Sequence, residues 1–368
     1  MSGILTLPRV TLFIPLNSHA AAAAAFRTCA LVFLLLVVLT SSLTYGGIPE
    51  GSLSGVVTDS ATGRPLESTN VFLSNTLRGA VTDKNGRYIL TAVQPGVYQL
   101  VASHVGYEHV AVRIEIAGGD SVVCNFELAP RAVRAQEVEV VAEAPVRWRR
   151  DLSEFRREFI GSGEFAGDCG LLNPEVLSFR WDDATGIFHA STDSTLRVKN
   201  SALGYVLSVT LDSFTWDPGT EAVGFKIYVH FEALLPQKEG DSARWARNRK
   251  IAYRGSERHF LRALVKGTLN SEGFFVSDAQ GVSFGSKAHK VLLIQPDGIR
   301  LLAYDSILRI DFGGETRLRR NYVKLAQGLV HIRPDGSLVE QEEFLIDPSS
   351  DWARHRVARM LPLEFQPE

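Results

Sequence analysis

The stretch "GAVTDKNGRYILTAVQPGVYQLVASHVGYE", residues 79–108, decides the fold because short apolar runs in it are separated by strong turn signals. Asn85-Gly86 supplies two residues that tolerate positive φ, which a tight hairpin requires. Gln94-Pro95-Gly96 is a second turn signal, in which the proline presets φ. The stretch therefore predicts antiparallel strands joined by tight turns.

The same pattern extends over residues 51–130. Apolar and polar residues alternate in short runs, as they do in strands that bury one face. Further turn signals stand at residues 62–65 and 118–120. This regular succession of short strands and turns predicts an antiparallel β-sandwich. The residues expected to build its turns are Gly63, Pro65, Gly86, Pro95 and Gly96.

Three aspartates of this region lie at turns. Asp59 and Asp83 can accept backbone hydrogen bonds where a turn opens. Calcium binding by Asp59, Asp83 and Asp120 is the alternative, but calcium takes six or more oxygen ligands and the spacing is unlike that of an EF-hand. A structural role in turns is the favoured interpretation.

Four motifs in this region occur together and in order: G-x-V-x-D-x-x-T-G-x-P-L from Gly55, T-D-x-x-G-x-Y from Thr82, P-G-x-Y-x-L from Pro95, and Gly106-Tyr107. In these motifs the region resembles the carboxypeptidase-regulatory-like domain, a transthyretin-like β-sandwich. The resemblance implies a module that is not itself a peptidase. Members of that family accompany metallocarboxypeptidases, outer-membrane receptor plugs and many exported bacterial proteins.

Residues 131–164 are expected to connect this module to a second region. Residues 136–141 alternate like a strand, and "DLSEFRREFI" places Leu152, Phe155, Phe159 and Ile160 on one helix face. Residues 165–368 are expected to form a larger β-rich domain, because alternating runs recur through them. One or two helices are predicted within residues 241–267, with Ser256 as an N-cap.

The second region also carries a resemblance, in "FIGSGEFAGDCGLLNPEVLSF", "LRVKNSALGYVLSVTLDSF", "RKIAYRGSERHFLRALVKGTLNSEGF" and "MLPLEF". These segments are similar to a group of exported proteins, commonest in Bacteroidetes-type bacteria, that contain a carboxypeptidase-like regulatory domain. The resemblance implies no catalytic residues for this region.

Residues 1–46 are expected to be a signal peptide or an N-terminal anchor. Ten apolar residues, Ala30–Leu39, follow Arg27, which is short for a membrane span but typical of a signal-peptide core. Export to the periplasm, outer membrane or cell surface is the favoured prediction. The alternative is that residues 28–44 anchor the chain in the inner membrane.

Charge and motifs exclude several function classes. The formal net charge of −2 provides no basic field to attract nucleic acid, and acidic residues interrupt the basic run at residues 147–157. The sequence has no peptidase, serine-hydrolase or nucleotide-binding motif. Without a CxxC pair, the three cysteines predict no structural metal site, and no cofactor is expected. Whether Cys124 and Cys169 pair is left open.

The densest polar group of the second region offers a candidate site. Arg254, Arg258, His259 and Arg262 could bind an anion or a partner, although such charges are more often surface or capping ion pairs. Four tryptophans could line a sugar site or belong to the core: Trp181, Trp216, Trp245 and Trp352.

These observations predict a non-catalytic cell-envelope protein that binds an envelope protein or glycan, or gives structural support. The alternative is an envelope hydrolase or carbohydrate-active enzyme with its site in residues 150–368.

Overall fold

The computed structural model describes residues 49–131, 146–282, 292–294, 300–313, 318–333, 336–338 and 344–367. Glu50–Glu368 forms one unit, separate from Met1–Pro49. The expected leader and the expected strand at residues 136–141 lie outside the described residues. Within the described ranges, every helix falls short of the length and apolar character that a membrane crossing needs.

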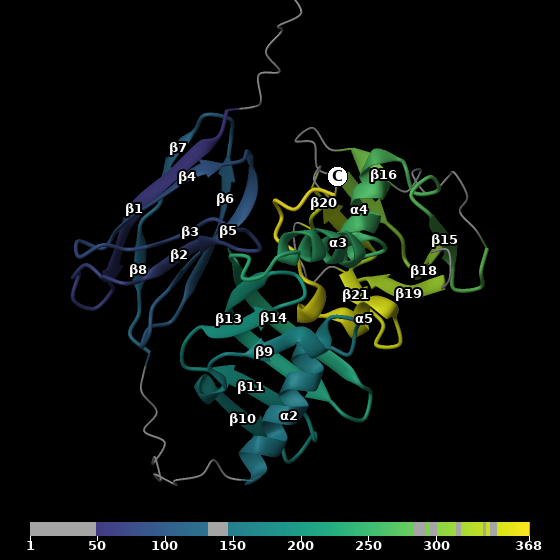
Figure 1. Cartoon of the computed structure of the whole chain (residues 1–368), viewed down its shortest axis with the longest axis horizontal. Coiled ribbons are helices and arrows are strands. Elements are labelled where there is room, and N and C mark those ends of the chain that lie inside the picture. Colours follow the sequence, from purple (N-terminus) through teal and green to yellow (C-terminus); the bar gives the residue numbers. More distant parts are fainter. Residues whose placement is uncertain are drawn as a thin grey trace, which may run out of the picture. The chain divides into compact units, whose positions relative to one another are not determined.

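The chain is mainly β, and the predicted N-terminal β-sandwich is confirmed (Figure 1). One sheet has the order β4-β1-β7, with β8 also pairing with β1, and the other has the order β3-β2-β5-β6. β1 pairs with β4 in antiparallel fashion and with β7 and β8 in parallel. The strands are β1 (Gly51–Asp59), β2 (Asn70–Leu73), β3 (Gly79–Val81), β4 (Arg87–Val93), β5 (Gly96–Ser103), β6 (Val110–Ile116), β7 (Ser121–Val123) and β8 (Phe126–Leu128).

The core of the sandwich follows from the period-two alternation of its strands. In β4, Tyr88 and Leu90 are buried while Ile89 between them is 62% exposed. Because successive side chains of a strand point to opposite faces, this places one apolar face inward. Leu53 of β1 and Leu100 of β5 complete the contact between the two sheets.

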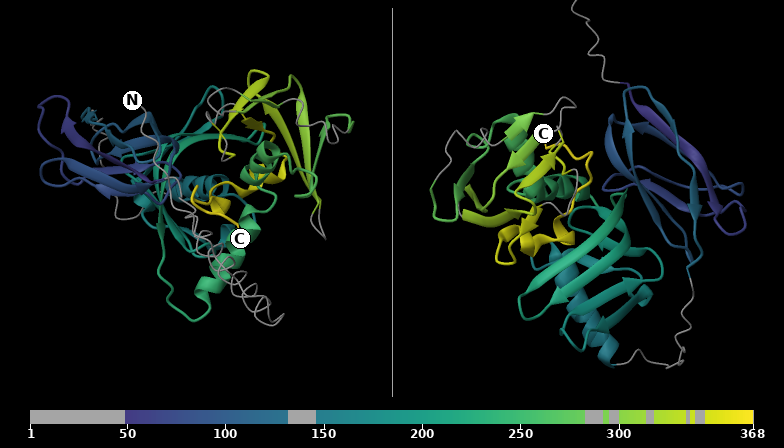
Figure 2. Two further views of the ribbon diagram at one scale, coloured as in Figure 1. Left: turned by 90° about the horizontal axis from the view of Figure 1, so that it is seen from above. Right: turned by 180° about the vertical axis from the view of Figure 1, so that it is seen from behind.

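A six-stranded sheet and one helix form a second core. The sheet has the order β10-β11-β13-β12-β9, and β14 pairs with β13. Helix α2 (Val146–Ile160) lies on one face of this sheet (Figures 1 and 2) and buries Phe155, Phe159 and Ile160, as its predicted apolar face requires. The strands are β9 (Cys169–Leu171), β10 (Leu177–Trp181), β11 (Phe188–Thr192), β12 (Leu196–Asn200), β13 (Tyr205–Asp217) and β14 (Ala222–Ala233), with the short 3₁₀ turns Ala166–Asp168 and Pro174–Val176 near β9.

In the long hairpin of β13 and β14, the residue positions of β13 that point into the core change partway along the strand. Leu207 pairs with Phe231 and faces the core, but the register shifts between Leu211 and Ser213. A bulge adds one residue to one strand and so reverses which positions point inward. Phe214 is therefore buried, and Asp212 is left at the surface.

The remaining elements build a third core. One sheet has the order β15-β18-β19-β21 and the other has the order β16-β17-β20. Helix α4 packs Phe260, Leu261 and Leu264 into this core. The strands are β15 (Phe274–Asp278), β16 (Leu292–Ile294), β17 (Arg300–Ala303), β18 (Ile307–Gly313), β19 (Leu318–Leu325), β20 (Leu329–Ile332) and β21 (Phe344–Ile346); the helices are α3 (Asp241–Tyr253), α4 (Glu257–Lys266) and α5 (Asp351–His355), followed by the 3₁₀ turn η5 (Val357–Arg359).

The loop between β2 and β3 joins the sandwich to the six-stranded sheet by main-chain hydrogen bonds. The Asn75 N–H donates to the Val229 carbonyl oxygen at 2.6 Å, and the Phe231 N–H donates to that of Thr76 at 2.9 Å. Thr76 thereby forms a parallel bridge with His230 of β14. The loop thus continues the pairing of the sheet beyond β14.

Candidate functional site

The turn between α3 and α4 carries the predicted site residues. Gly255 reverses the chain there with φ of +73°. The Ser256 hydroxyl accepts a hydrogen bond from the His259 N–H at 3.2 Å and caps α4, which confirms the predicted N-cap. The cap brings Arg258, His259 and Arg262 onto the first turns of one helix.

His259 is buried in the core. Its Nδ1 accepts a hydrogen bond from the Gly255 N–H at 3.0 Å, so the ring proton is on Nε2, which lies 3.2 Å from Oε2 of Glu272. The ring packs against Phe274 with centroids 4.8 Å apart. Burial lowers the pKa of His259 and thus favours the neutral form. This histidine positions the α3–α4 turn.

Arg258 holds the C-terminal segment of the chain. Its guanidinium donates hydrogen bonds of 2.6 to 3.4 Å to four carbonyl oxygens of residues 361–365. Arg262 reaches the same segment through the Phe365 carbonyl oxygen, at 3.4 Å. Both guanidinium groups lie within 6 Å of the Tyr253 ring centroid, at 5.9 and 5.7 Å. We call this group, Arg258 and Arg262 with residues 361–365, the tail clamp.

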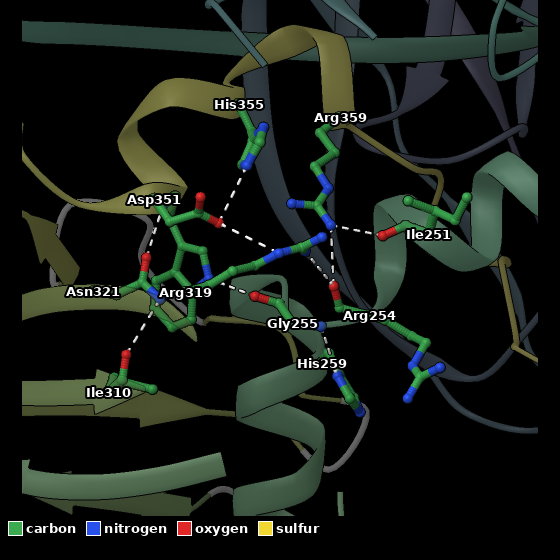
Figure 3. Close-up of polar contacts among 11 residues, drawn as sticks. Ile251, Arg254, Gly255, His259, Ile310, Arg319, Asn321, Asp351, His355 and Arg359 are labelled. Atoms are coloured by element: carbon green, nitrogen blue, oxygen red, sulfur yellow. Dashed lines mark hydrogen bonds and ion pairs between the residues drawn. The ribbon is translucent and has the colours of Figure 1, made fainter. Parts of the chain in front are cut away.

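Arg254 contributes its backbone rather than its charge. Its carbonyl oxygen accepts hydrogen bonds from Arg319 at 2.9 Å and from Arg359 at 3.0 Å. Figure 3 shows its side chain directed away from these contacts, and that side chain is exposed. The four predicted residues are therefore neighbours in space, but their charges do not converge on one point.

A second polar cluster, which the sequence did not reveal, lies next to this turn (Figure 3). Oδ2 of Asp351 is 3.2 Å from Nε2 of His355 and 4.0 Å from Nε of Arg319. Burial opposes ionisation of Asp351, but the hydrogen bond from His355 and the charges of Arg319 and Arg359 outweigh it and lower its pKa. Asp351 is therefore an anion held between basic groups.

Arg359 of this cluster is 8% exposed and closes the end of α3. It donates to the carbonyl oxygens of Ile251 at 2.6 Å and Arg254 at 3.0 Å. The last carbonyls of a helix lack partners within the helix, and a basic side chain can supply them. Burial, together with the nearby charge of Arg319, lowers the pKa of Arg359 to about 10. Its partners make it a helix cap.

The aspartates considered for calcium also have main-chain partners. Asp59 accepts hydrogen bonds from two backbone N–H groups at 2.8 Å and from the Tyr107 hydroxyl at 2.7 Å. Asp83 accepts from the N–H groups of Asn85 and Arg87, and Asp120 accepts from that of Ala117. In the described parts of the chain, no group of three His, Cys, Asp or Glu side chains is arranged to hold a metal ion.

The predicted turn residues act in two ways. Gly63 and Gly86 have φ of +69° and +70°, a conformation that favours glycine. A Cβ on Gly86 would also lie 2.4 Å from the Val57 carbonyl oxygen. Gly96 instead opens β5 after the turn, with the Tyr98 ring close to its Cα hydrogens. Pro65 forms an isolated bridge with Thr58, and Pro95 lies in the bend before β5.

Two of the four candidate tryptophans have structural roles, and the two cysteines do not pair. Trp245 and Trp352 are buried, and each donates its indole N–H to a backbone carbonyl oxygen. Cys124 and Cys169 are both free thiols. Burial raises the pKa of Cys169 to about 12, so its thiol stays protonated. Of the basic run, Arg147 and Arg150 lie within 4 Å of the Asp151 carboxylate, at 3.8 and 3.7 Å.

Comparisons with solved structures gave partial matches. The chain aligns with 5-hydroxyisourate hydrolase of Klebsiella pneumoniae at 27% identity over 22% of this chain and 92% of that one, with a TM-score of 0.19. It aligns with the pilus 2b backbone protein of group B streptococcus at 16% identity over 22% of this chain and 41% of that one, with a TM-score of 0.20. It aligns with catechol 1,2-dioxygenase of Acinetobacter sp. ADP1 at 14% identity over 28% of this chain and 59% of that one, with a TM-score of 0.21. At these TM-scores the likenesses support no conclusion about function.

A search of curated proteins found no match. A family model does match: that of the CarboxypepD_reg-like domain, at residues 53–140. The match covers the described strands β2 to β8, most of β1 and the motifs from Gly55 to Tyr107. The chain thus contains a CarboxypepD_reg-like domain at residues 53–140, and the described part of this range, residues 53–131, lies in a two-sheet β-sandwich.

Proposed function

We propose that this chain is a non-catalytic protein of the cell envelope that binds a partner through its CarboxypepD_reg-like domain. The proposal rests on one observation: the polar side chains around the α3–α4 turn form hydrogen bonds with the main chain. Arg258, Arg262 and Arg359 donate to main-chain carbonyls of this same chain. His259 accepts from a main-chain N–H. Groups engaged in this way hold the fold together and present no converging acid, base and nucleophile to a substrate.

The sandwich offers a surface suited to a partner. Ile89 of β4 and Val123 of β7 lie on either side of Ser54 in one row across the outer face of the sheet. Their side chains are 62% and 71% exposed. A protein partner is favoured over a glycan, because sugar rings pack on aromatic faces and this row is aliphatic.

The main-chain pairing of Asn75 and Thr76 with β14 supports the idea that the module is held in place and not loosely tethered. A rigidly held module loses less conformational freedom on binding. The rest of the chain would then serve to hold the binding module in a fixed position.

Export is part of the same proposal. Arg27 followed by the apolar run Ala30–Leu39 supports a signal peptide, with anchoring by residues 28–44 as the alternative. Fractionation of cells expressing the chain tests this part. Recovery of the chain in the cytoplasmic fraction, with its N-terminus intact, would refute export.

Cross-linking of the full chain in envelope fractions, followed by mass spectrometry, tests the binding. The expected result is one specific protein partner, lost in Ile89→Lys/Val123→Lys and retained in the control Val146→Lys. Val146 is also an exposed valine, at 84%, but it lies on α2.

The same purified chain is then incubated with panels of glycans and peptides. Turnover of any of them, together with unchanged cross-linking by the double variant, would overturn the proposal in favour of an envelope hydrolase with its site in residues 150–368.

A further inference from the structure

The outer face of the sheet β15-β18-β19-β21 combines exposed apolar and basic side chains. Phe275, Ile307 and Leu345 are 58%, 41% and 50% exposed. They lie on three different strands of one sheet (Figure 1). Solvation of large apolar side chains is unfavourable, so a group of them on one face points to a docking surface.

The strand register shows that these side chains share a face. Phe275 pairs with Asp311, which pairs with Arg320. Ile307 and Leu345 both pair with Lys324 of β19. Because residues paired across antiparallel strands project to the same side, the apolar side chains and these charges form one surface. We call it the β19 face.

The β19 face is basic. Of the charged side chains that the paired strands place on it, Arg309, Arg320 and Lys324 are positive and Asp311 is negative. Asp347, just beyond β21, adds a second carboxylate next to Tyr322, so the positive charges still outnumber the negative ones. Asp311 lies between two of the arginines, 2.7 Å from Arg309 and 3.1 Å from Arg320. One carboxylate shared by two guanidinium groups leaves an excess of positive charge, to which exposed Lys324 adds.

The charges are spaced like alternate residues of an extended chain. Arg320, Tyr322 and Lys324 occupy every second position of β19 and so project from the same side of it. Each step along that row is about 6.4–6.8 Å, which is the two-residue repeat of any β-strand laid beside it. An extended peptide with two carboxylates four residues apart and an apolar residue midway between them would match this row. Its carboxylates would meet Lys324 and Arg320, and its apolar residue would meet Tyr322.

We infer that the β19 face binds an extended acidic polypeptide segment of a partner protein. Charge complementarity selects the carboxylates, and the exposed Phe275, Ile307 and Leu345 select the apolar residues between them. A polysaccharide could supply carboxylates but has no apolar side chain to cover Ile307 and Leu345. This surface is separate from the row formed by Ile89 and Val123, so the inference does not depend on the proposed function.

The test measures binding of a labelled peptide, Thr-Glu-Thr-Leu-Thr-Glu-Thr, to the full chain in mild detergent by fluorescence anisotropy. We expect saturable binding that weakens with added salt, because exposed charges are screened. The same peptide with glutamine in place of glutamate should not bind.

Lys324→Glu should weaken binding about fivefold to tenfold, since it replaces an attraction by a repulsion at an exposed site. Phe275→Ser should weaken it about threefold or more. Lys84→Glu makes the same charge change on an exposed turn of the sandwich and is expected to leave the affinity unchanged. Equal thermal midpoints of the variants establish that each is folded.

Three results would overturn the inference: no saturable peptide binding, equal affinity of Lys324→Glu and the unsubstituted chain, or binding of polygalacturonate that Lys324→Glu abolishes while the peptide does not bind. None of them alters the cross-linking through Ile89 and Val123, so the two proposals fail separately.

Discussion

Asn75 of the sandwich donates its N–H to the Val229 carbonyl oxygen of β14 at 2.6 Å, and its own carbonyl oxygen accepts from the Leu363 N–H at 2.8 Å. One residue thus links three segments distant in sequence: the sandwich, the six-stranded sheet and the C-terminal segment. Asn75 holds this position with φ of +61°, in the left-handed region. Asparagine tolerates that region better than most residues other than glycine.

Asn75→Val tests the importance of this conformation. A β-branched residue is strongly disfavoured at positive φ, so the variant should lose about 1–2 kcal/mol of unfolding free energy. Asn75→Gly is the matched control, because glycine adopts the same φ without strain and keeps both backbone hydrogen bonds. Urea titration measures both. Equal midpoints for the valine and glycine variants would show that the backbone at Asn75 is not constrained as described.

Arg258→Ala tests the tail clamp. The change removes the donor to four carbonyl oxygens of residues 361–365 and should lower the unfolding free energy by about 2–3 kcal/mol. Hydrogen exchange should also accelerate at the Leu363 N–H, which bonds to Asn75.

Arg247→Ala is the control for that experiment, since Arg247 is an exposed arginine on the neighbouring helix α3. Retained protection of the Leu363 N–H in Arg258→Ala would mean that the segment is held without the clamp.

The sequence predicted those parts of the structure that depend on neighbours along the chain. Asn85-Gly86 marked a turn, but the predicted hairpin is wrong, because the strands that the turn joins, β3 and β4, belong to different sheets. The spacing of Phe155 and Phe159 marked the buried face of α2, and Ser256 marked the start of α4. In each case the signal and its partner lie within a few residues of each other, where helix and turn geometry fix the contact.

The sequence could not predict contacts between distant residues. Arg258 was recognised as part of a polar group, but its partners lie 103 to 107 residues away, so its role as a clamp had no local signal. Asp351 and His355 have the spacing of one helical turn, but Arg319 reaches Asp351 only because β19 lies beside α5. The register shift at Leu211 likewise depends on β14.

His230 of β14, which forms a bridge with Thr76 of the sandwich, should make the stability of the protein depend on pH. Burial lowers its pKa, although the charges of Glu232 and Glu364 act in the opposite sense. Its ring lies against Phe72, with centroids 5.7 Å apart, and against Gly79. The unfolded chain therefore takes up a proton near pH 6.5 that the folded chain takes up only at lower pH. Stability should fall as the pH drops below about 6.5, with a slope of at most ~1.4 kcal/mol per pH unit.

The expected result for His230→Gln is a shallower fall in stability than that of the unsubstituted chain between about pH 6.5 and pH 5, measured by urea titration at a series of pH values. His259→Gln removes a second histidine whose pKa is also lowered by burial, and it serves to separate the two contributions. If the His230→Gln curve runs parallel to that of the unsubstituted chain, His230 does not titrate differently on folding.

Glu257, in the first turn of α4, should act with the opposite sign. Burial raises the pKa of Glu257 to about 7, so between about pH 4.5 and pH 7 the folded chain keeps a proton that the unfolded chain releases. Stability contributed by the neutral acid is complete below about pH 4.5 and is lost as the pH rises through 7. Glu257→Gln is neutral at every pH and should gain about 2–3 kcal/mol relative to the unsubstituted chain between pH 4.5 and pH 8. Glu239→Gln, at an exposed carboxylate just before α3, is the matched control. A Glu257→Gln difference that stays constant over this range would show that the carboxyl group is hydrated in the folded protein.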